Sequence, residues 1–490
     1  MKKLFNYKDR VIFFILTIFL LIKLYLFSYI PLVNDEAYTL TISRQFSLSY
    51  FDHPPLTMWI LYFLSQNLNI ENSSFFRIPF IFFGVFSSYF LFLIGKILYS
   101  TKVGIISAML YFLSPFFFFS GGLLIVPDAP LNFFILAALY FSLKIIFVQK
   151  ENHLIEWLLL GIFLALSFLS KYQSYFFGLF LLIYFLCWKK ELFFSKNFAL
   201  AFIIASTGLL PVIIWNIQND FASFAFHQSR SSFNFQLSHF TGLLFVQLFF
   251  VLPSTGILIF LNFFACIKKK VSQREKFIFF LAFPPLLLFN LLNFVSINSF
   301  AHWSMFGWML LIPSGASFLT SLNLFKLQTY FLKILNVILA FSLILIILIH
   351  ANNGFLTLRS QPDIPKWDNT KEILDWSHIV NVLKNNLSKK EIESIVTMDW
   401  YYSGQLNTAF DFKYDIGVIG DNDHHFRYLN IPKKQPLVLL DIKLLNELND
   451  PLLNEKLIEL KYITLEKKLI PFYRGKSIYG HIKIYKIKRK

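Results

Sequence analysis

Long apolar stretches alternate with short polar segments from the N-terminus to about residue 350. Each stretch holds about 20 residues, the length that an α-helix needs to cross roughly 30 Å of hydrocarbon. The pattern predicts eleven membrane-spanning helices, over residues 11–30, 78–99, 103–120, 130–148, 154–170, 172–188, 198–217, 240–265, 277–295, 304–322 and 328–350. The predicted fold class is an all-α polytopic membrane bundle over 1–350, followed by a soluble domain over 351–490.

The first polar segment, residues 31–77, is the longest connection before residue 350 and is not uniformly polar. Residues 37–46 predict a helix. Residues 56–64 follow two prolines and predict a second helix, too short to span and lying in the membrane interface. We expect this loop to form a lid at the membrane surface that holds Asp35 and His53 near each other.

The residues after 350 mix polar and apolar positions and predict a small mixed α/β domain. Residues 371–386 have the pattern of a helix. Residues 393–398, 437–441 and 478–488 have the pattern of strands, the last with alternating isoleucines and lysines.

Positive charge is distributed unevenly across the predicted topology. With the N-terminus in the cytoplasm, inner turns carry runs such as Lys268-Lys269-Lys270, whereas outer connections carry only Arg44, Arg77, Lys171 and Arg230. This bias follows the positive-inside rule, and an odd number of spans then places the tail domain outside. The net charge of +17 is thus mostly topological, and scattered cations in short turns do not indicate a nucleic-acid partner.

Composition supports the same class of protein. Apolar residues make up 56% of the chain and charged residues only 15%, which excludes an ordinary soluble protein. Cys187 and Cys266 both fall at inner helix ends, where thiols stay reduced, so we expect no disulfide.

The unusual polar side chains all fall on the predicted outer side. Ionisable groups at the edge of a membrane are costly to desolvate, and a one-sided set of acids and bases indicates chemistry at that surface. The set consists of Asp35, Glu36, Asp52, His53, Asp128, Lys171, His227, Arg230 and His302.

Each of these residues also has a purely structural interpretation. Asp35 and Asp128 each stand where a carboxylate can cap a helix, and Glu36 would be a first-turn acid favoured by the helix dipole. Lys171 ends a span where a lysine can reach the lipid surface, and His302 stands beside an interfacial tryptophan.

A second polar cluster lies in the tail, at Asp421, Asp423, His424 and His425. Its composition is that of a metal site, but its spacing is not diagnostic. We interpret it as a solvated loop and predict no metal and no cofactor.

Five short motifs occur in a fixed order along the chain. They are Asn34-Asp35-Glu36-Ala37-Tyr38, Tyr50-Phe51-Asp52-His53-Pro54-Pro55-Leu56, Val126-Pro127-Asp128-Ala129-Pro130-Leu131, Leu169-Ser170-Lys171-Tyr172 and Ala301-His302-Trp303. Together they resemble the bacterial branch of the protein O-mannosyltransferase superfamily, which has the GT-C fold and includes the lipid A aminoarabinose transferases. Members take sugar from a polyprenyl or dolichyl phosphate on the outer side of the membrane.

The resemblance implies specific roles. Asp35 and Asp128 match the two acidic sites of the family and are the candidate catalytic residues. Arg230 stands where the family has cations that face the lipid phosphate, and His53 replaces a lysine that aminoarabinose transferases carry before the two prolines. The candidate substrate-binding residues are Glu36, Asp52, His53, Lys171, Arg230 and His302.

The implied reaction is a single inverting displacement at an anomeric carbon, with polyprenyl phosphate as the leaving group. Lys171, Arg230 and His53 are candidate cations for the charge on that phosphate. If the acceptor is a hydroxyl, Asp35 is the candidate general base; if it is a phosphate, Asp35 and Asp128 would instead orient the sugar.

The expected partners are a polyprenyl-phosphate sugar donor and an envelope acceptor, namely lipid A, another glycolipid or a protein. The expected location is the bacterial inner membrane, with the active site and the tail in the periplasm. A lipid-linked sugar flippase is the alternative from another class, although transporters usually place ionisable groups near the membrane midplane.

Overall fold

The computed structural model describes residues 7–67, 72–148, 153–230, 234–268, 271–322, 336–337, 339–340, 374–429, 436–444, 452–474 and 477–490. The chain divides into two compact units. The first comprises Met1–Tyr25, Ser47–Thr57 and Arg77–Ile344, and the second comprises Leu26–Phe46, Met58–Phe76 and Leu345–Lys490. The first loop therefore contributes residues to both units.

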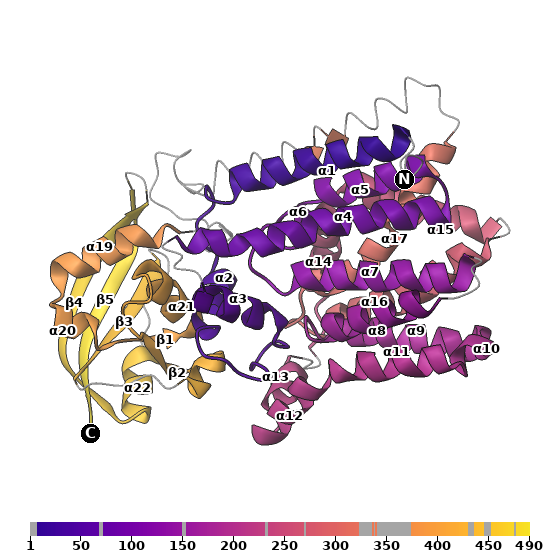
Figure 1. Ribbon diagram of the computed structural model, residues 1–490. Helices are drawn as coiled ribbons and strands as arrows, with labels where there is room; N and C mark the ends of the chain where they lie inside the picture. Colours follow the sequence, from indigo (N-terminus) through magenta and orange to yellow (C-terminus); the bar gives the residue numbers. More distant parts are fainter. Residues whose placement is uncertain are drawn as a thin grey trace. The chain divides into compact units, whose positions relative to one another are not determined.

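The first unit is helical, and Figure 1 shows several of its long helices running in a similar direction. Its helices are α1 (Tyr7–Leu26), α4 (Ile78–Leu98), α5 (Thr101–Leu113), α6 (Pro115–Phe119), α7 (Asp128–Phe147), α8 (Leu154–Phe168), α9 (Ser174–Trp188), α10 (Lys190–Phe193), α11 (Lys196–Thr207), α12 (Leu210–Gln218), α13 (Ala222–Ser229), α14 (Leu237–Phe250), α15 (Pro253–Lys268), α16 (Gln273–Val295), η2 (Ala301–Ser304) and α17 (Met305–Ser321).

Among the described residues, four helical segments are long and apolar enough to cross a membrane: Ser73–Leu98, Asp128–Phe147, Lys196–Gln218 and Gln273–Val295. Of the other predicted spans, 11–30 falls largely on the 20-residue helix α1, and the rest of those within the described residues form shorter, bent or interrupted apolar helices. The predicted span 328–350 lies almost entirely outside the described residues. The count of eleven spans therefore stays a prediction.

The prediction of one continuous helix over 240–265 is wrong. The chain forms two helices, α14 and α15, whose axes differ by 101°. Leu252 at the junction has a left-handed φ of 67°, and Pro253 begins the second helix. Proline has no N–H to donate and its ring clashes with the preceding turn, so a helix cannot continue through it undisturbed.

Helices α4 and α5 approach each other closely through glycine. A Cβ added to Gly104 would lie 2.3 Å from the Phe92 carbonyl oxygen, and one added to Gly95 would lie 2.8 Å from the Gly104 Cα. Small residues allow such backbone contact between helices in a membrane protein.

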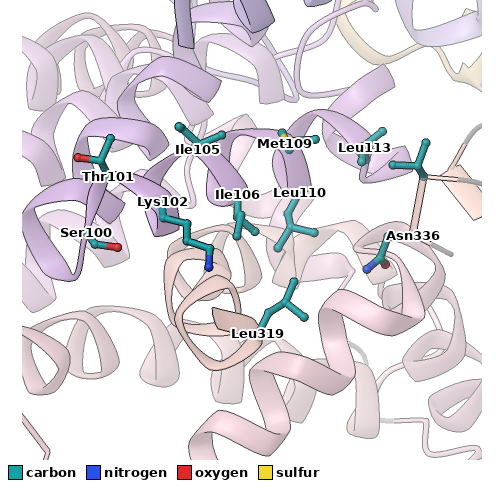
Figure 2. Close-up of a pocket in the computed structure, with 11 residues that line it drawn as sticks. Ser100, Thr101, Lys102, Ile105, Ile106, Met109, Leu110, Leu113, Leu319 and Asn336 are labelled. Carbon is teal, nitrogen blue, oxygen red and sulfur yellow. The ribbon is translucent and has the colours of Figure 1, made fainter. Parts of the chain in front are cut away.

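A largely apolar cavity of about 650 Å³ lies along α5 (Figure 2). Ile105, Met109 and Leu113 of α5 form one wall, and Leu319 and Asn336 lie opposite. None of the candidate site residues lines this cavity.

The second unit is built on a five-stranded sheet with the strand order β2-β1-β3-β5-β4. Strand β1 pairs in parallel with β2 and β3, whereas β5 pairs antiparallel with β3 and β4. Its elements are α2 (Asn34–Ile42), α19 (Trp376–Asn386), α20 (Lys389–Ile392), β1 (Ile395–Asp399), α21 (Trp400–Ala409), β2 (Gly417–Asn422), η5 (His424–Tyr428), β3 (Leu437–Leu444), α22 (Leu452–Glu459), β4 (Tyr462–Arg474) and β5 (Ser477–Arg489). Two further elements of the first loop are α3 (Leu56–Asn67) and η1 (Ser73–Arg77).

The mixed α/β character expected of the tail is confirmed, and so are its predicted helix and three strands, as α19, β1, β3 and β5. Strands β2 and β4 were not predicted. Both are edge strands, and β4 exposes much of its length, so its sequence mixes lysine, glutamate and apolar residues without a buried face to mark it.

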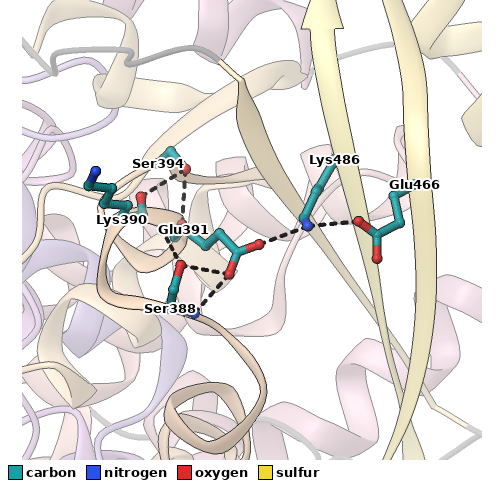
Figure 3. A network of polar contacts seen from close by, with 6 residues as sticks. All are labelled: Ser388, Lys390, Glu391, Ser394, Glu466 and Lys486. Atoms are coloured by element: carbon teal, nitrogen blue, oxygen red, sulfur yellow. Dashed lines mark hydrogen bonds and ion pairs between the residues drawn. The ribbon is translucent and has the colours of Figure 1, made fainter.

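A charged network joins α20 to the last two strands (Figure 3). Lys486 Nζ lies 2.9 Å from a Glu391 carboxylate oxygen and 2.7 Å from a Glu466 carboxylate oxygen. Bonds from Lys486 and Ser388 lower the pKa of Glu391 to about 2, so the carboxylate stays ionised at neutral pH.

The glycine contact between α4 and α5 can be tested with one substitution at two positions. Gly104→Ala should destabilise the first unit by about 1–3 kcal/mol, because the new methyl group overlaps the Phe92 carbonyl. Gly242→Ala, also in a helix but with no atom within 4 Å of the new Cβ, should be neutral or stabilising. Thermal unfolding in detergent measures both; equal midpoints would contradict the close approach.

Candidate active site

The segment Asp52-His53-Pro54-Pro55 forms a tight turn that is fixed to the bundle through its backbone. Within the turn, the Tyr50 N–H donates to the His53 carbonyl at 3.3 Å. At its end, the Leu56 N–H donates to the Leu169 carbonyl at 2.9 Å, which joins it to the turn between α8 and α9. The two prolines restrict the intervening backbone, so the position of His53 is well defined.

Helix α13 supplies two further contacts to this turn. The Ser223 hydroxyl donates to the Tyr50 carbonyl at 3.2 Å, and His227 Nε2 lies 3.1 Å from the Asp52 carbonyl oxygen. The His227 ring also packs edge-on against Tyr172, with ring centroids 4.9 Å apart. His227 belongs to the outer polar set but is not among the candidate substrate-binding residues. Its contact with the Asp52 backbone could not be inferred from local sequence.

An ion pair joins α7 to the turn between α8 and α9. Lys171 Nζ lies 2.8 Å from both carboxylate oxygens of Asp128, and the two side chains are only 6% and 13% exposed. Asp128 is the first residue of α7, not its cap, because the cap position is Pro127. The interpretation of Lys171 as a lysine that reaches the lipid surface is also wrong, since its ammonium group is held by Asp128.

The charges of this ion pair act on two histidines that are far apart in the sequence. The charges of Lys171 and Asp128 both shift the pKa of His53 and that of His302. His53 also contributes to the shift in the pKa of His302. Arg230 completes the group: its guanidinium carbon lies 5.4 Å from the centre of the Phe300 ring, on which His302 stacks at 5.6 Å. The first unit therefore brings together Asp52, His53, Asp128, Lys171, Arg230 and His302.

Burial keeps the histidines of this group uncharged near neutral pH. It lowers the pKa of His53 to about 4 and that of His302 to about 3, and it also lowers the pKa of His227. The low pKa of His53 argues against the expected positive charge on its side chain. Lys171 and Arg230 are the cations of this group.

Several buried polar atoms around the turn have no hydrogen-bond partner among the described residues. Native interiors usually satisfy such atoms, so their concentration here indicates room for water or for polar groups of a ligand. They are His53 Nδ1, Thr57 Oγ1 and Tyr175 Oη.

Asp35 and Glu36 lie in the second unit, in the first turn of α2. The helix begins at Asn34 and not at Ala37, so the interpretation of Asp35 as its cap is wrong. Asp35 is exposed, whereas Glu36 is fully buried and accepts a 3.0 Å hydrogen bond from the Val33 N–H. The expected proximity of Asp35 to His53, and the role of Glu36 in substrate binding, stay predictions.

The interpretation of Asp421, Asp423, His424 and His425 as a solvated loop is wrong for the two histidines, whereas Asp421 is exposed. His424 and His425 are buried, and the His425 N–H donates to the Tyr38 hydroxyl at 3.1 Å. Across the described ranges, no group of three or more His, Cys, Asp and Glu side chains is placed to hold a metal ion.

Because Asp128 and Lys171 form a buried ion pair, removing one charge should destabilise the protein more than removing both. Lys171→Met should destabilise the protein by about 3–5 kcal/mol, because it leaves a buried carboxylate without a counter-charge. The double variant Asp128→Asn/Lys171→Met should recover most of that loss in thermal unfolding. Lys413→Met, at an exposed pair whose side chains are 71% and 59% exposed, is the control and should have little effect. Additive losses in the double variant would contradict a coupled pair.

The lowered histidine pKa values predict acid sensitivity. Between about pH 6.5 and pH 4 the unfolded chain binds protons that the folded site does not, so stability should fall as the pH falls through this window. In the His53→Gln variant, the unfolding midpoint should depend less on pH between about pH 6.5 and pH 4 than it does in the wild-type protein. Above about pH 7, the dependence of the midpoint on pH should be the same in both proteins. An undiminished slope in the variant would show that His53 is not a source of the effect.

The chain is similar to known proteins in part of its sequence and in its fold. Residues 52–215 match the family model described as dolichyl-phosphate-mannose-protein mannosyltransferase. No curated protein sequence matches the chain.

Solved structures share the fold over nearly the whole chain. ArnT from Cupriavidus metallidurans bound to undecaprenyl phosphate is 12% identical, with a TM-score of 0.64 and 98% of each chain covered. The same protein in the apo state gives a TM-score of 0.61 at 12% identity, with 97% of each chain covered. An Archaeoglobus fulgidus oligosaccharyltransferase tethered to an acceptor peptide gives 0.53 at 12% identity, with 97% of this chain and 74% of that chain covered. The chain therefore has the fold of ArnT, and the family match over residues 52–215 agrees with the resemblance that its motifs indicated.

Proposed function

We propose that this protein is an integral-membrane glycosyltransferase that moves a sugar from a polyprenyl-phosphate donor to an envelope acceptor. The observation that carries this proposal is the buried Asp128–Lys171 pair, with His53, His302 and Arg230 grouped around it in the first unit. The undecaprenyl phosphate bound to the ArnT structure supports an undecaprenyl-linked donor.

The leaving phosphate is the part of the donor that this group of residues suits best. When the glycosidic bond breaks, negative charge builds on the phosphate oxygens, and fixed cations stabilise it. Asp128 neutralises and orients Lys171, so the ammonium group is held in place before the donor arrives. Arg230 supplies the second cation and can contact two phosphate oxygens at once.

The neutral histidines are suited to a different task. An uncharged imidazole donates one hydrogen bond and accepts another, so His53 and His302 can contact sugar hydroxyls or phosphate oxygens without adding fixed charge. His53 Nδ1 is already buried and has no hydrogen-bond partner in the described part of the chain.

Asp35 is the proposed second carboxylate of the reaction, and it belongs to the other unit. If a hydroxyl group attacks the anomeric carbon, Asp35 removes its proton as a general base; one bond to the acceptor oxygen forms as the bond to the phosphate breaks. If the acceptor is a phosphate, no base is required, and Asp35 and Asp128 orient the sugar. Both routes invert the anomeric centre in one step, without a metal.

The proposed acceptor is lipid A or another glycolipid, and a protein is the second candidate. We place the reaction on the periplasmic side of a bacterial inner membrane, because the charge distribution assigns the first loop and the tail to that side. A flippase for the same lipid-linked sugar is the alternative from another class.

The test is sugar transfer in liposomes that contain the purified protein and radiolabelled undecaprenyl-phosphate sugars. With a hydroxyl acceptor, Asp35→Asn should lower kcat by about 100-fold or more, the usual contribution of a general base. Asp411→Asn, an exposed carboxylate of the tail, is the control and should retain activity.

Full activity of Asp35→Asn would remove this carboxylate from the mechanism. Movement of the labelled lipid across the bilayer without transfer would favour the flippase. Mass spectrometry of lipid A and of envelope glycoproteins from a deletion strain would identify the acceptor.

A further inference from the structure

Helix α2, which carries Asp35, is built into the second unit through helix α21 of the tail. The side-chain amide of Gln405 donates to the Leu32 carbonyl at 2.9 Å and to the Asn34 side-chain oxygen at 3.0 Å. Gln405 is only 2% exposed, and Asn34 is the first residue of α2. These two bonds fix the chain on the N-terminal side of Asp35.

The residue before Gln405 brings the two backbones into contact. A Cβ added to Gly404 would lie 2.8 Å from the Tyr38 Cα and 2.8 Å from its nitrogen. No side chain larger than hydrogen fits there unless α2 moves, so α21 lies directly on α2.

Tyr38 fixes the middle of α2 to the same domain. Its ring centre lies 4.8 Å from Trp400, 5.9 Å from His424 and 6.0 Å from Phe426. Its hydroxyl also accepts the His425 N–H, so the polar tail cluster serves to hold α2.

We infer that Gln405 is a positioning residue for the transfer reaction: it fixes the first turn of α2 and thereby the location of the Asp35 carboxylate. The tail domain then affects the reaction through α2, the helix that carries Asp35. This inference rests on the proposed function. Asp35 follows Asn34 in the first turn of α2, and Gln405 holds this turn through the Leu32 carbonyl and the Asn34 side chain.

Asn407 offers a matched control on the same helix. It is 4% exposed, and its side-chain amide likewise donates two hydrogen bonds, to the Ser403 and Ile416 carbonyls, each at 2.8 Å. Its bonds remain within the tail. Gln405→Glu and Asn407→Asp therefore make the same chemical change, from amide to carboxylate. Only Gln405→Glu removes the hydrogen bonds to Leu32 and Asn34.

The experiment combines hydrogen exchange with kinetics on the full-length protein in detergent or liposomes. Gln405→Glu should raise the exchange rate of the amides of residues 34–42 about tenfold, and Asn407→Asp should leave them at the wild-type rate. In the transfer assay, Gln405→Glu should lower kcat about tenfold or more, with the donor KM unchanged, because Lys171 and Arg230 in the first unit are untouched.

Wild-type exchange of residues 34–42 in Gln405→Glu would overturn the inference, and so would an equal loss of kcat in Asn407→Asp. Absence of transfer by the wild-type protein would overturn the proposed function and with it the role of Gln405 in the reaction. The exchange rates would still show separately whether Gln405 fixes α2.

Discussion

The site in the first unit depends on one constraint: a charge inside an apolar helical bundle needs a partner. Asp128 and Lys171 satisfy each other at 2.8 Å, and each would be costly there alone. The same low-polarity surroundings keep His53 and His302 neutral, so the group has fixed cations and uncharged hydrogen-bonding rings. That combination suits a ligand with an anionic phosphate and a polyhydroxylated sugar.

Backbone contacts, more than side-chain contacts, position the turn that carries His53. The Leu169 carbonyl holds its end, and Ser223 and His227 hold the Tyr50 and Asp52 carbonyls. Carbonyl acceptors are available whatever the side chain is, so a change of lysine to histidine at position 53 can alter the chemistry of the site without altering the path of the loop.

The candidate carboxylates are divided between two folding units. Asp128 is anchored by Lys171 within the bundle, whereas Asp35 is carried by a helix that the tail domain holds through Gln405 and Tyr38. His424 and His425 of the tail contact Tyr38 of α2, so the tail domain helps to hold this helix.

The sequence by itself determined the class of the protein, its apolar helices, the helix and three of the strands of the tail, and the family resemblance that the match over residues 52–215 supports. These follow from local periodicity and short motifs, which need no knowledge of distant contacts. Only the tertiary structure decided the 101° bend between α14 and α15, the pairing of Asp128 with Lys171, the neutrality of His53 and the contact of His227 with the turn. Ion pairing and burial depend on residues that meet only after folding, and for that reason no local pattern could show them.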